Sequence, residues 1–171
     1  MTRGGAAGGN AADEKWMRRA LELARRSRDA GEVPVGALIT DVRGELVAEG
    51  RNRVIAAGDP SAHAEMDAIR RAAEYMGNYR LLNTTLYVTM EPCIMCMGAV
   101  IHARIERVVF GAFDTSWGAA GSLYDFSDDV RFNHRVLIRS GLMAAESREL
   151  VRAFFQVRRR HGPAMHHDRG R

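Results

Sequence analysis

The chain has 171 residues, 46% of them hydrophobic, which is enough for one domain with a core of its own. No stretch approaches the roughly 20 apolar residues of a membrane-spanning helix, and two cysteines three positions apart, Cys93 and Cys96, exclude a secreted disulfide scaffold and predict a cytoplasmic protein. The net charge of the chain is +4, and residues 158–171, with five arginines and one aspartate, carry the same net charge. This basic segment either binds a polyanion or is merely solvated.

The first elements are a tail, a helix and a hairpin. Residues 1–12 contain no apolar run, which predicts a flexible N-terminal tail rather than a secretory signal. Apolar residues recur at helical spacing over residues 13–30, and Gly31 and Pro34 end that helix. Two strands then flank the turn Asp41–Gly44, at residues 35–40 and 45–49.

A helix-start signal, Asp59-Pro60-Ser61, follows the hairpin, and Pro60 suits the first helical position. The remaining elements alternate between helices and strands. They are a helix at 62–76, a strand at 85–90, a helix at 93–102, strands at 107–113 and 135–139, and a helix at 144–160.

Strand–helix–strand units predict a sheet covered by helices on both faces. The fold class is therefore α/β, a three-layer α/β/α domain with a five-stranded mixed sheet. We expect the domain to span residues 13–160, with a basic flexible tail at 161–171. The connection between Asp114 and Asn133 is long for a compact domain, and such loops are often functional.

Two short motifs carry candidate chemistry, His63-Ala64-Glu65 and Pro92-Cys93-Ile94-Met95-Cys96. Each lies at the start of a predicted helix, where a thiolate is favoured over a thiol. One histidine and two cysteines would leave a tetrahedral zinc ion one open position, as in catalytic rather than structural sites. Glu65 is then placed to move a proton from a zinc-activated water to the leaving group.

Each motif alone is weak evidence. A histidine at a helix start is more often capped or packed than a ligand, and a CxxC pair after a strand also fits a thioredoxin-type redox site. Together, in this order, the motifs match the H-x-E…P-C-x-x-C signature of zinc nucleobase deaminases.

The chain is similar to the bacterial tRNA-specific adenosine deaminases over nearly its whole length. The zinc motifs are common to the wider superfamily, whereas the Asn133-His134 pair and the FFxxRRR stretch are more particular to the tRNA enzymes. The matching stretches are EVPVGALI (32–39), GRNRVI (50–55), DPSAHAE (59–65), NYRLLNTTLYVTMEPCIMCMGAVIHARI (78–105), RVVFGAFD (107–114), GAAGSL (118–123), NHRV (133–136) and FFQVRRR (154–160).

This resemblance implies a cytidine-deaminase-like fold and a homodimer that converts the wobble adenosine of a tRNA anticodon loop to inosine. It implies one zinc ion per subunit and proton transfer by the glutamate. The residues it assigns are His63, Cys93 and Cys96 to zinc, Glu65 to catalysis, and Asn52, Ala64, Asp114, Asn133 and Phe155 to the RNA substrate.

Some alternatives remain open. Asn52, Asp114 and Asn133 are also ordinary turn residues, and of the adjacent pair Phe154 and Phe155 only one is expected to face RNA. Relatives commonly have Lys-Thr where this chain has Ser116-Trp117. The positive charge expected to contact a phosphate is therefore missing, and Trp117 offers a ring that can stack on a base instead. The competing functions are deamination of a free base, such as guanine or cytosine, and a zinc-stabilised RNA-binding module without catalysis.

Overall fold

Five strands form one mixed sheet in the computed structural model, which describes residues 8–161. The strand order is β2-β1-β3-β4-β5. Strand β1 is antiparallel to β2 and β3, whereas β4 is parallel to β3 and β5. The strands are β1 Gly36–Thr40, β2 Leu46–Arg51, β3 Thr85–Met90, β4 Arg107–Ala112 and β5 Leu137–Arg139.

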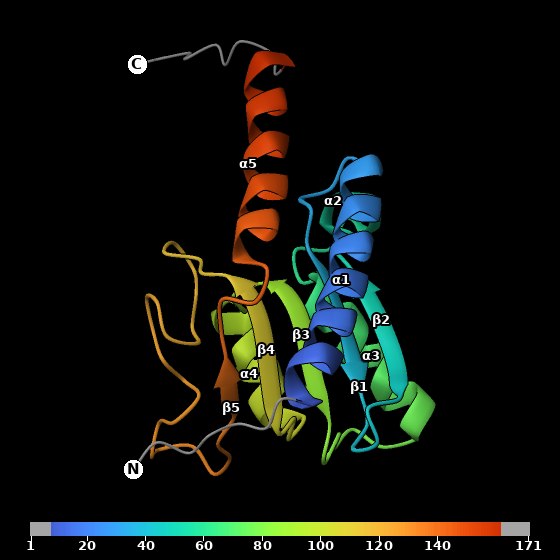
Figure 1. Cartoon of the computed structure of the whole chain (residues 1–171), viewed down its shortest axis with the longest axis vertical. Coiled ribbons are helices and arrows are strands. Elements are labelled where there is room, and N and C mark those ends of the chain that lie inside the picture. Colours follow the sequence, from blue (N-terminus) through green and yellow to red (C-terminus); the bar gives the residue numbers. More distant parts are fainter. Residues whose placement is uncertain (1–7, 162–171) are drawn as a thin grey trace, which may run out of the picture.

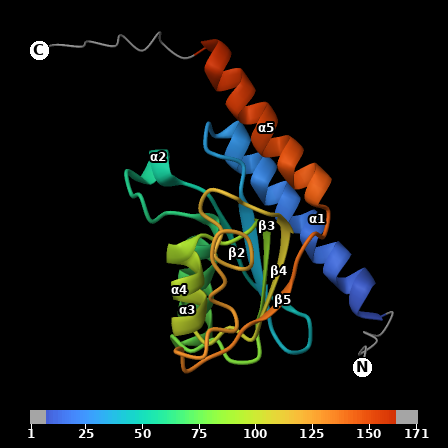
Figure 2. The same cartoon turned by 90° about the vertical axis from the view of Figure 1, so that its left-hand side faces the viewer.

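Helices cover both faces of this sheet (Figures 1 and 2). Helices α1 (Gly8–Asp29) and α5 (Ala144–His161) pack on one face, and α3 (Ala64–Met76) and α4 (Ile94–His102) on the other. The predicted three-layer α/β/α arrangement is thus confirmed. The observed ends of the five strands differ from the predicted ends by at most two residues. A short helix, α2 (Val54–Ala57), was not expected.

The core is divided by the sheet because alternate strand residues point to opposite faces. Leu38 and Tyr87 pack with α1, while Ile39, Val88 and Phe110 join the larger cluster under α3 and α4. All five are buried. No helix within residues 8–161 combines the length and apolar character needed to cross a membrane.

Helix α1 begins earlier than expected. It starts at Gly8, so residues 8–12 are helical and the expected tail at 1–12 is too long by five residues. Ala11 and Ala12 favour helix and no proline interrupts the segment. Residues 1–7 and 162–171 lie outside the described part of the chain, and the flexible tails expected there stay predictions.

Helix α3 begins later than expected, at Ala64, with His63 as its N-cap. The Asp59-Pro60-Ser61 signal forms a turn instead of the first helical residues. The Asp59 carboxylate accepts hydrogen bonds from the Ser61 amide at 2.8 Å and the Ser61 hydroxyl at 2.7 Å, which is the local bonding that makes aspartate a turn former. This turn delivers His63 to the helix start.

Gly50 on β2 allows α3 to lie close to the sheet. A Cβ at Gly50 would come within 2.2 Å of the Ala64 carbonyl oxygen and 2.4 Å of the Ala68 amide nitrogen. Only glycine permits backbones to approach so closely. The first turn of α3 is therefore held against the end of β2, next to Asn52.

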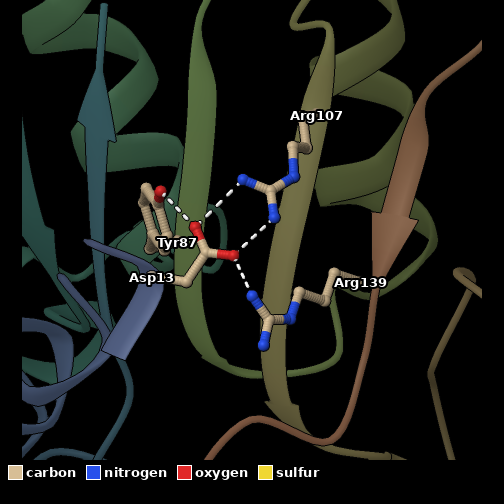
Figure 3. A network of polar contacts seen from close by, with 4 residues as sticks. All are labelled: Asp13, Tyr87, Arg107 and Arg139. Atoms are coloured by element: carbon tan, nitrogen blue, oxygen red, sulfur yellow. Dashed lines mark hydrogen bonds and ion pairs between the residues drawn. The ribbon is translucent and has the colours of Figure 1, made fainter. Parts of the chain in front are cut away.

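A buried carboxylate ties α1 to three strands. Asp13 is 1% exposed and accepts hydrogen bonds from Tyr87 on β3 at 2.8 Å and from both terminal nitrogens of Arg107 on β4, at 3.0 and 2.5 Å. Arg139 on β5 donates to the same carboxylate (Figure 3). The network joins the first helix to the part of the sheet that carries α4 and α5.

Candidate metal centre

Three side chains from two helix starts converge beyond the end of β3. His63 is the N-cap of α3, Cys93 is the N-cap of α4, and Cys96 lies in the first turn of α4. The Nδ1 atom of His63 is 3.7 Å from the Cys93 Sγ atom and 3.6 Å from the Cys96 Sγ atom. All three ligand atoms lie within 4.8 Å of one another.

These separations fit a zinc ion. Zinc–sulfur bonds of about 2.3 Å and zinc–nitrogen bonds of about 2.0–2.1 Å at a tetrahedral angle place nitrogen and sulfur about 3.6 Å apart, which the His63–cysteine distances match. Among residues 8–161, no other histidine, cysteine, aspartate or glutamate joins this cluster. One histidine and two cysteines would leave the fourth position for water or substrate.

The two helix N-termini favour negative charge at this point. Neither N-cap side chain bonds to the backbone of its own helix, which leaves His63 and Cys93 free to face the site. A hydrogen bond from the Cys96 thiol lowers the pKa of Cys93 to about 4, helped by His63. The same hydrogen bond and burial raise the pKa of Cys96, and metal binding requires that both thiols lose their protons.

Glu65 lies beside the three ligands without belonging to their set. It is in the first turn of α3 and is 4% exposed. Burial raises the pKa of Glu65 to about 7, because the charged form loses its hydration. A carboxyl group with this pKa both takes up and releases a proton near neutral pH, as a general acid–base catalyst must.

Asn52 and Ala64 lie at the same rim of the site. Asn52 follows β2 directly and is 7% exposed, and its amide donates to the Val35 carbonyl oxygen at 3.2 Å. Ala64 is the first residue of α3 and is fully buried. The Arg53 amide, next to Asn52, donates to the Ala62 carbonyl oxygen at 2.9 Å, which holds the segment after β2 against the residues that lead into His63.

Asp114 lies in the loop after β4, and its backbone amide donates to the Glu91 carboxylate, next to the Pro92-Cys93 turn, at 3.0 Å. The Asp114 carboxylate accepts hydrogen bonds from the amides of Ser116 at 2.9 Å and Trp117 at 3.3 Å. Within the chain, the contacts of the Asp114 carboxylate are therefore those of a turn-forming residue. Trp117 is 66% exposed, so this turn presents an aromatic ring to solvent.

The adjacent phenylalanines of α5 are distinguished by burial. Phe154 is 8% exposed and packs on the body of the protein, whereas Phe155 is 41% exposed. Phe155 is thus the one available to a partner. The C-terminal half of α5 projects past the edge of the sheet at which β3 ends (Figure 1), on the side of the metal centre.

Asn133 is not brought to this site within one chain. Its side-chain oxygen and its backbone carbonyl accept hydrogen bonds from Arg104, at 2.8 and 2.9 Å. Arg104 follows the C-terminal end of α4, whereas Cys93 caps the N-terminus of that nine-residue helix. At about 1.5 Å per residue, roughly 14 Å of helix separates the two positions.

Two further residues anchor segments that adjoin candidate site residues, and they were not anticipated. Glu32 and Glu91 are buried carboxylates, 1% and 3% exposed. Each accepts hydrogen bonds from backbone amides that lie 23 or more positions away in the chain. No local pattern marks such residues, because their partners belong to distant segments.

Comparison with known proteins agrees with the site. The family model for the cytidine and deoxycytidylate deaminase zinc-binding region matches residues 10–112, which include all three candidate ligands and Glu65. The tRNA-specific adenosine deaminase of Haemophilus influenzae is 51% identical to this chain over 147 residues, covering 86% of the chain and 85% of the relative.

Solved structures lead to the same group of proteins. A tRNA deaminase studied for A-to-I editing at the wobble position is 40% identical, with a TM-score of 0.76 over 80% of this chain and 98% of that one. A guanine deaminase from Bacillus subtilis is 42% identical with a TM-score of 0.57, over 60% of this chain and 65% of that one.

Proposed function

Because the chain belongs to the cytidine and deoxycytidylate deaminase family, we propose that it hydrolyses the exocyclic amino group of adenosine at the wobble position of a tRNA anticodon loop. The products are inosine and ammonia. The observation that carries the proposal is 51% identity to a tRNA-specific adenosine deaminase over most of both chains, together with the His63–Cys93–Cys96 cluster beside Glu65.

His63, Cys93 and Cys96 would hold the zinc ion, which when bound activates water as a nucleophile near neutral pH. Glu65 takes a proton from the attacking water and passes it to the purine ring nitrogen. It then carries the second water proton to the departing amino group, which leaves as ammonia. Burial suits Glu65 to both proton transfers, because it holds the pKa of the carboxyl group at about 7.

The remaining residues contact the RNA in this proposal. Asn52 and the Ala64 backbone border the pocket for the flipped nucleoside, since single-stranded bases can be splayed out and hydrogen-bonded at their edges. Asp114 and the exposed ring of Phe155 meet neighbouring loop nucleotides, where an aromatic ring can stack on a base. Asn133, at the far end of α4, meets RNA outside the pocket.

Deamination of a free purine is the competing function. It is tested because the chain is also similar to a guanine deaminase. A free base has no phosphate for the arginines of α5 to bind. The deciding assay compares zinc-loaded protein on an anticodon stem-loop, free adenosine, guanine and cytosine. We expect product from the stem-loop alone. Ammonia from a free base and none from RNA would assign the other function.

The arginines that end α5 should contribute phosphate contacts. Replacing Arg159 and Arg160 with glutamine should weaken stem-loop binding and reduce the slope of log affinity against log salt by about 1.5, since each lost contact changes the slope by about 0.7–0.9. The matched control replaces the exposed Arg18 and Arg43, which belong to α1 and to the β1–β2 turn and pair with Glu14 and Asp41. Equal slopes in the two double variants, measured by fluorescence titration, would mean that the helix end is only solvated.

The proposal includes a homodimer in the cytoplasm, where tRNA is modified. The outer face of α4 supports a contact between copies of the chain. Ile94 and Met95 are 38% and 36% exposed, and Gly98 has nothing within 4 Å of its Cβ position. Gly98 thus leaves room for a second backbone to approach. Sedimentation of the zinc-loaded protein measures the oligomeric state.

A further inference from the structure

Two buried carboxylates each anchor a segment that carries a candidate substrate residue, Glu32 the segment 52–57 and Glu91 the segment 114–122. These two segments are called the walls of the site below. Glu91 directly precedes the Pro92-Cys93 turn, and Glu32 lies behind the segment that follows Asn52. In the part of the chain that the structure describes, the bonds to both side chains come from backbone amides and neither forms an ion pair. A buried charge is normally paired or fully hydrogen-bonded, so these contacts account for the presence of both carboxylates.

Glu91 gathers a single loop around its carboxylate. One oxygen accepts hydrogen bonds from the amides of Ala120 and Ser122, both at 3.0 Å, and the other accepts from the amide of Asp114, also at 3.0 Å. The two ends of the segment from Asp114 to Ser122 are therefore fixed to the same side chain. Trp117 lies at the exposed part of this segment.

The loop held by Glu91 also touches the candidate metal ligand. Gly118 forms an isolated antiparallel bridge with Cys93, and the amide of Ala119 donates to the Pro92 carbonyl oxygen at 2.9 Å. A Cβ at Gly118 would come within 2.4 Å of the Glu91 carboxyl carbon. The loop, the carboxylate and the start of α4 are thus packed as one unit.

Glu32 holds the other segment in a similar way. Its carboxylate oxygens accept hydrogen bonds from the amides of Ile55 at 3.1 Å and Ala56 at 2.7 Å, in the first residues of α2. The segment from Asn52 to Ala57 therefore depends on a buried anchor behind it. Ile55 is 59% exposed, so this wall, too, presents a large side chain to solvent.

We infer that Glu91 and Glu32 are positioning residues that hold the two walls of the site in the conformation that receives the RNA loop. The inference rests on the proposed function, because it concerns how that substrate enters. A wall that is ordered before binding loses no conformational entropy when RNA arrives. Neither carboxylate is assigned a contact with the reacting atoms, so their loss should act on KM more than on kcat.

The test replaces each residue with glutamine in the zinc-loaded full-length protein. Glutamine keeps the size of the side chain but turns an amide donor toward a backbone N–H, where an acceptor is needed. We expect Glu91→Gln and Glu32→Gln each to raise KM for the stem-loop about tenfold, with kcat within about twofold and zinc content unchanged. Glu106→Gln is the matched control, since Glu106 is exposed and lies before β4, at the opposite end of that strand from the site.

Hydrogen exchange of the zinc-loaded protein without RNA gives a readout independent of turnover. The amides of Asp114, Ala120 and Ser122 should exchange slowly in the wild type and rapidly in Glu91→Gln. Faster exchange with unchanged KM would overturn the positioning role, as would loss of zinc or a fall confined to kcat. If wild-type protein does not deaminate the stem-loop, the proposed function fails. This holds even if hydrogen exchange shows that Glu91 orders the segment from Asp114 to Ser122.

Discussion

Replacing Glu65 with glutamine should reduce turnover of the stem-loop by about 10²- to 10⁴-fold, the usual contribution of a general acid–base group. The zinc content and the fold should stay as in the wild type, because Glu65 is outside the ligand cluster. Glutamine fills the same buried space in the first turn of α3 but cannot take up or release the proton. The measurement is single-turnover inosine formation, with zinc determined on the same sample.

Asp67→Asn provides the matched control for this substitution. Asp67 lies two residues further along the same helical turn, and its carboxylate accepts hydrogen bonds from Arg71 at 2.9 Å and from the Arg51 amide at 3.4 Å without joining the metal cluster. Its replacement changes the same chemical group and should leave turnover within a few-fold of the wild type. Loss of zinc from the Glu65→Gln protein would contradict the mechanism, since it would make Glu65 a ligand.

The Asp13→Ala variant should be less stable than the wild type by about 3–5 kcal/mol, the usual result of removing one partner from a buried ion pair. Asp13 is 1% exposed, and its removal leaves Arg107 and Arg139, each about a third exposed, without their shared carboxylate (Figure 3). Chemical denaturation at neutral pH measures the difference. Asp29→Ala, which removes an exposed carboxylate of the same helix, should cost less than about 1 kcal/mol.

The stability difference at Asp13 should also depend on pH. Burial alone would raise the pKa of Asp13, but hydrogen bonds from Arg107, Tyr87 and Arg139 outweigh it and hold the pKa below the ordinary value. The stabilisation is therefore complete above the unfolded-state pKa of about 3.9 and is lost as the pH falls through the folded-state pKa. A gap between wild type and Asp13→Ala that stays constant down to acid pH would contradict this account.

Local patterns were enough to predict the layers of the fold and the proximity of two of the three candidate metal ligands. Helical and strand periodicities each involve residues a few positions apart, so strands such as Thr85–Met90 could be located from the sequence. Cys93 and Cys96 are close for the same reason, because three positions on a helix bring side chains to one face. His63 joins them from a second helix start, which the shared signature of the family indicates and periodicity does not.

Contacts between distant segments could not be predicted in this way. Asp13 meets Arg107 and Arg139 from 94 and 126 positions away, and Glu91 meets amides 23 to 31 positions further along. A sequence shows that such side chains can bond, but the partner is chosen by tertiary packing. The same reason explains why Phe154 and Phe155 could be told apart only by the surface that α5 buries.

The most direct test of the account is the position of the product in an anticodon stem-loop that carries adenosine at the wobble position and at one neighbouring loop position. Zinc-loaded protein is expected to form inosine at the wobble position only, and removal of zinc by a chelator is expected to stop the reaction. Inosine at both adenosines, or none in RNA with ammonia released from free guanine, would contradict the proposed function.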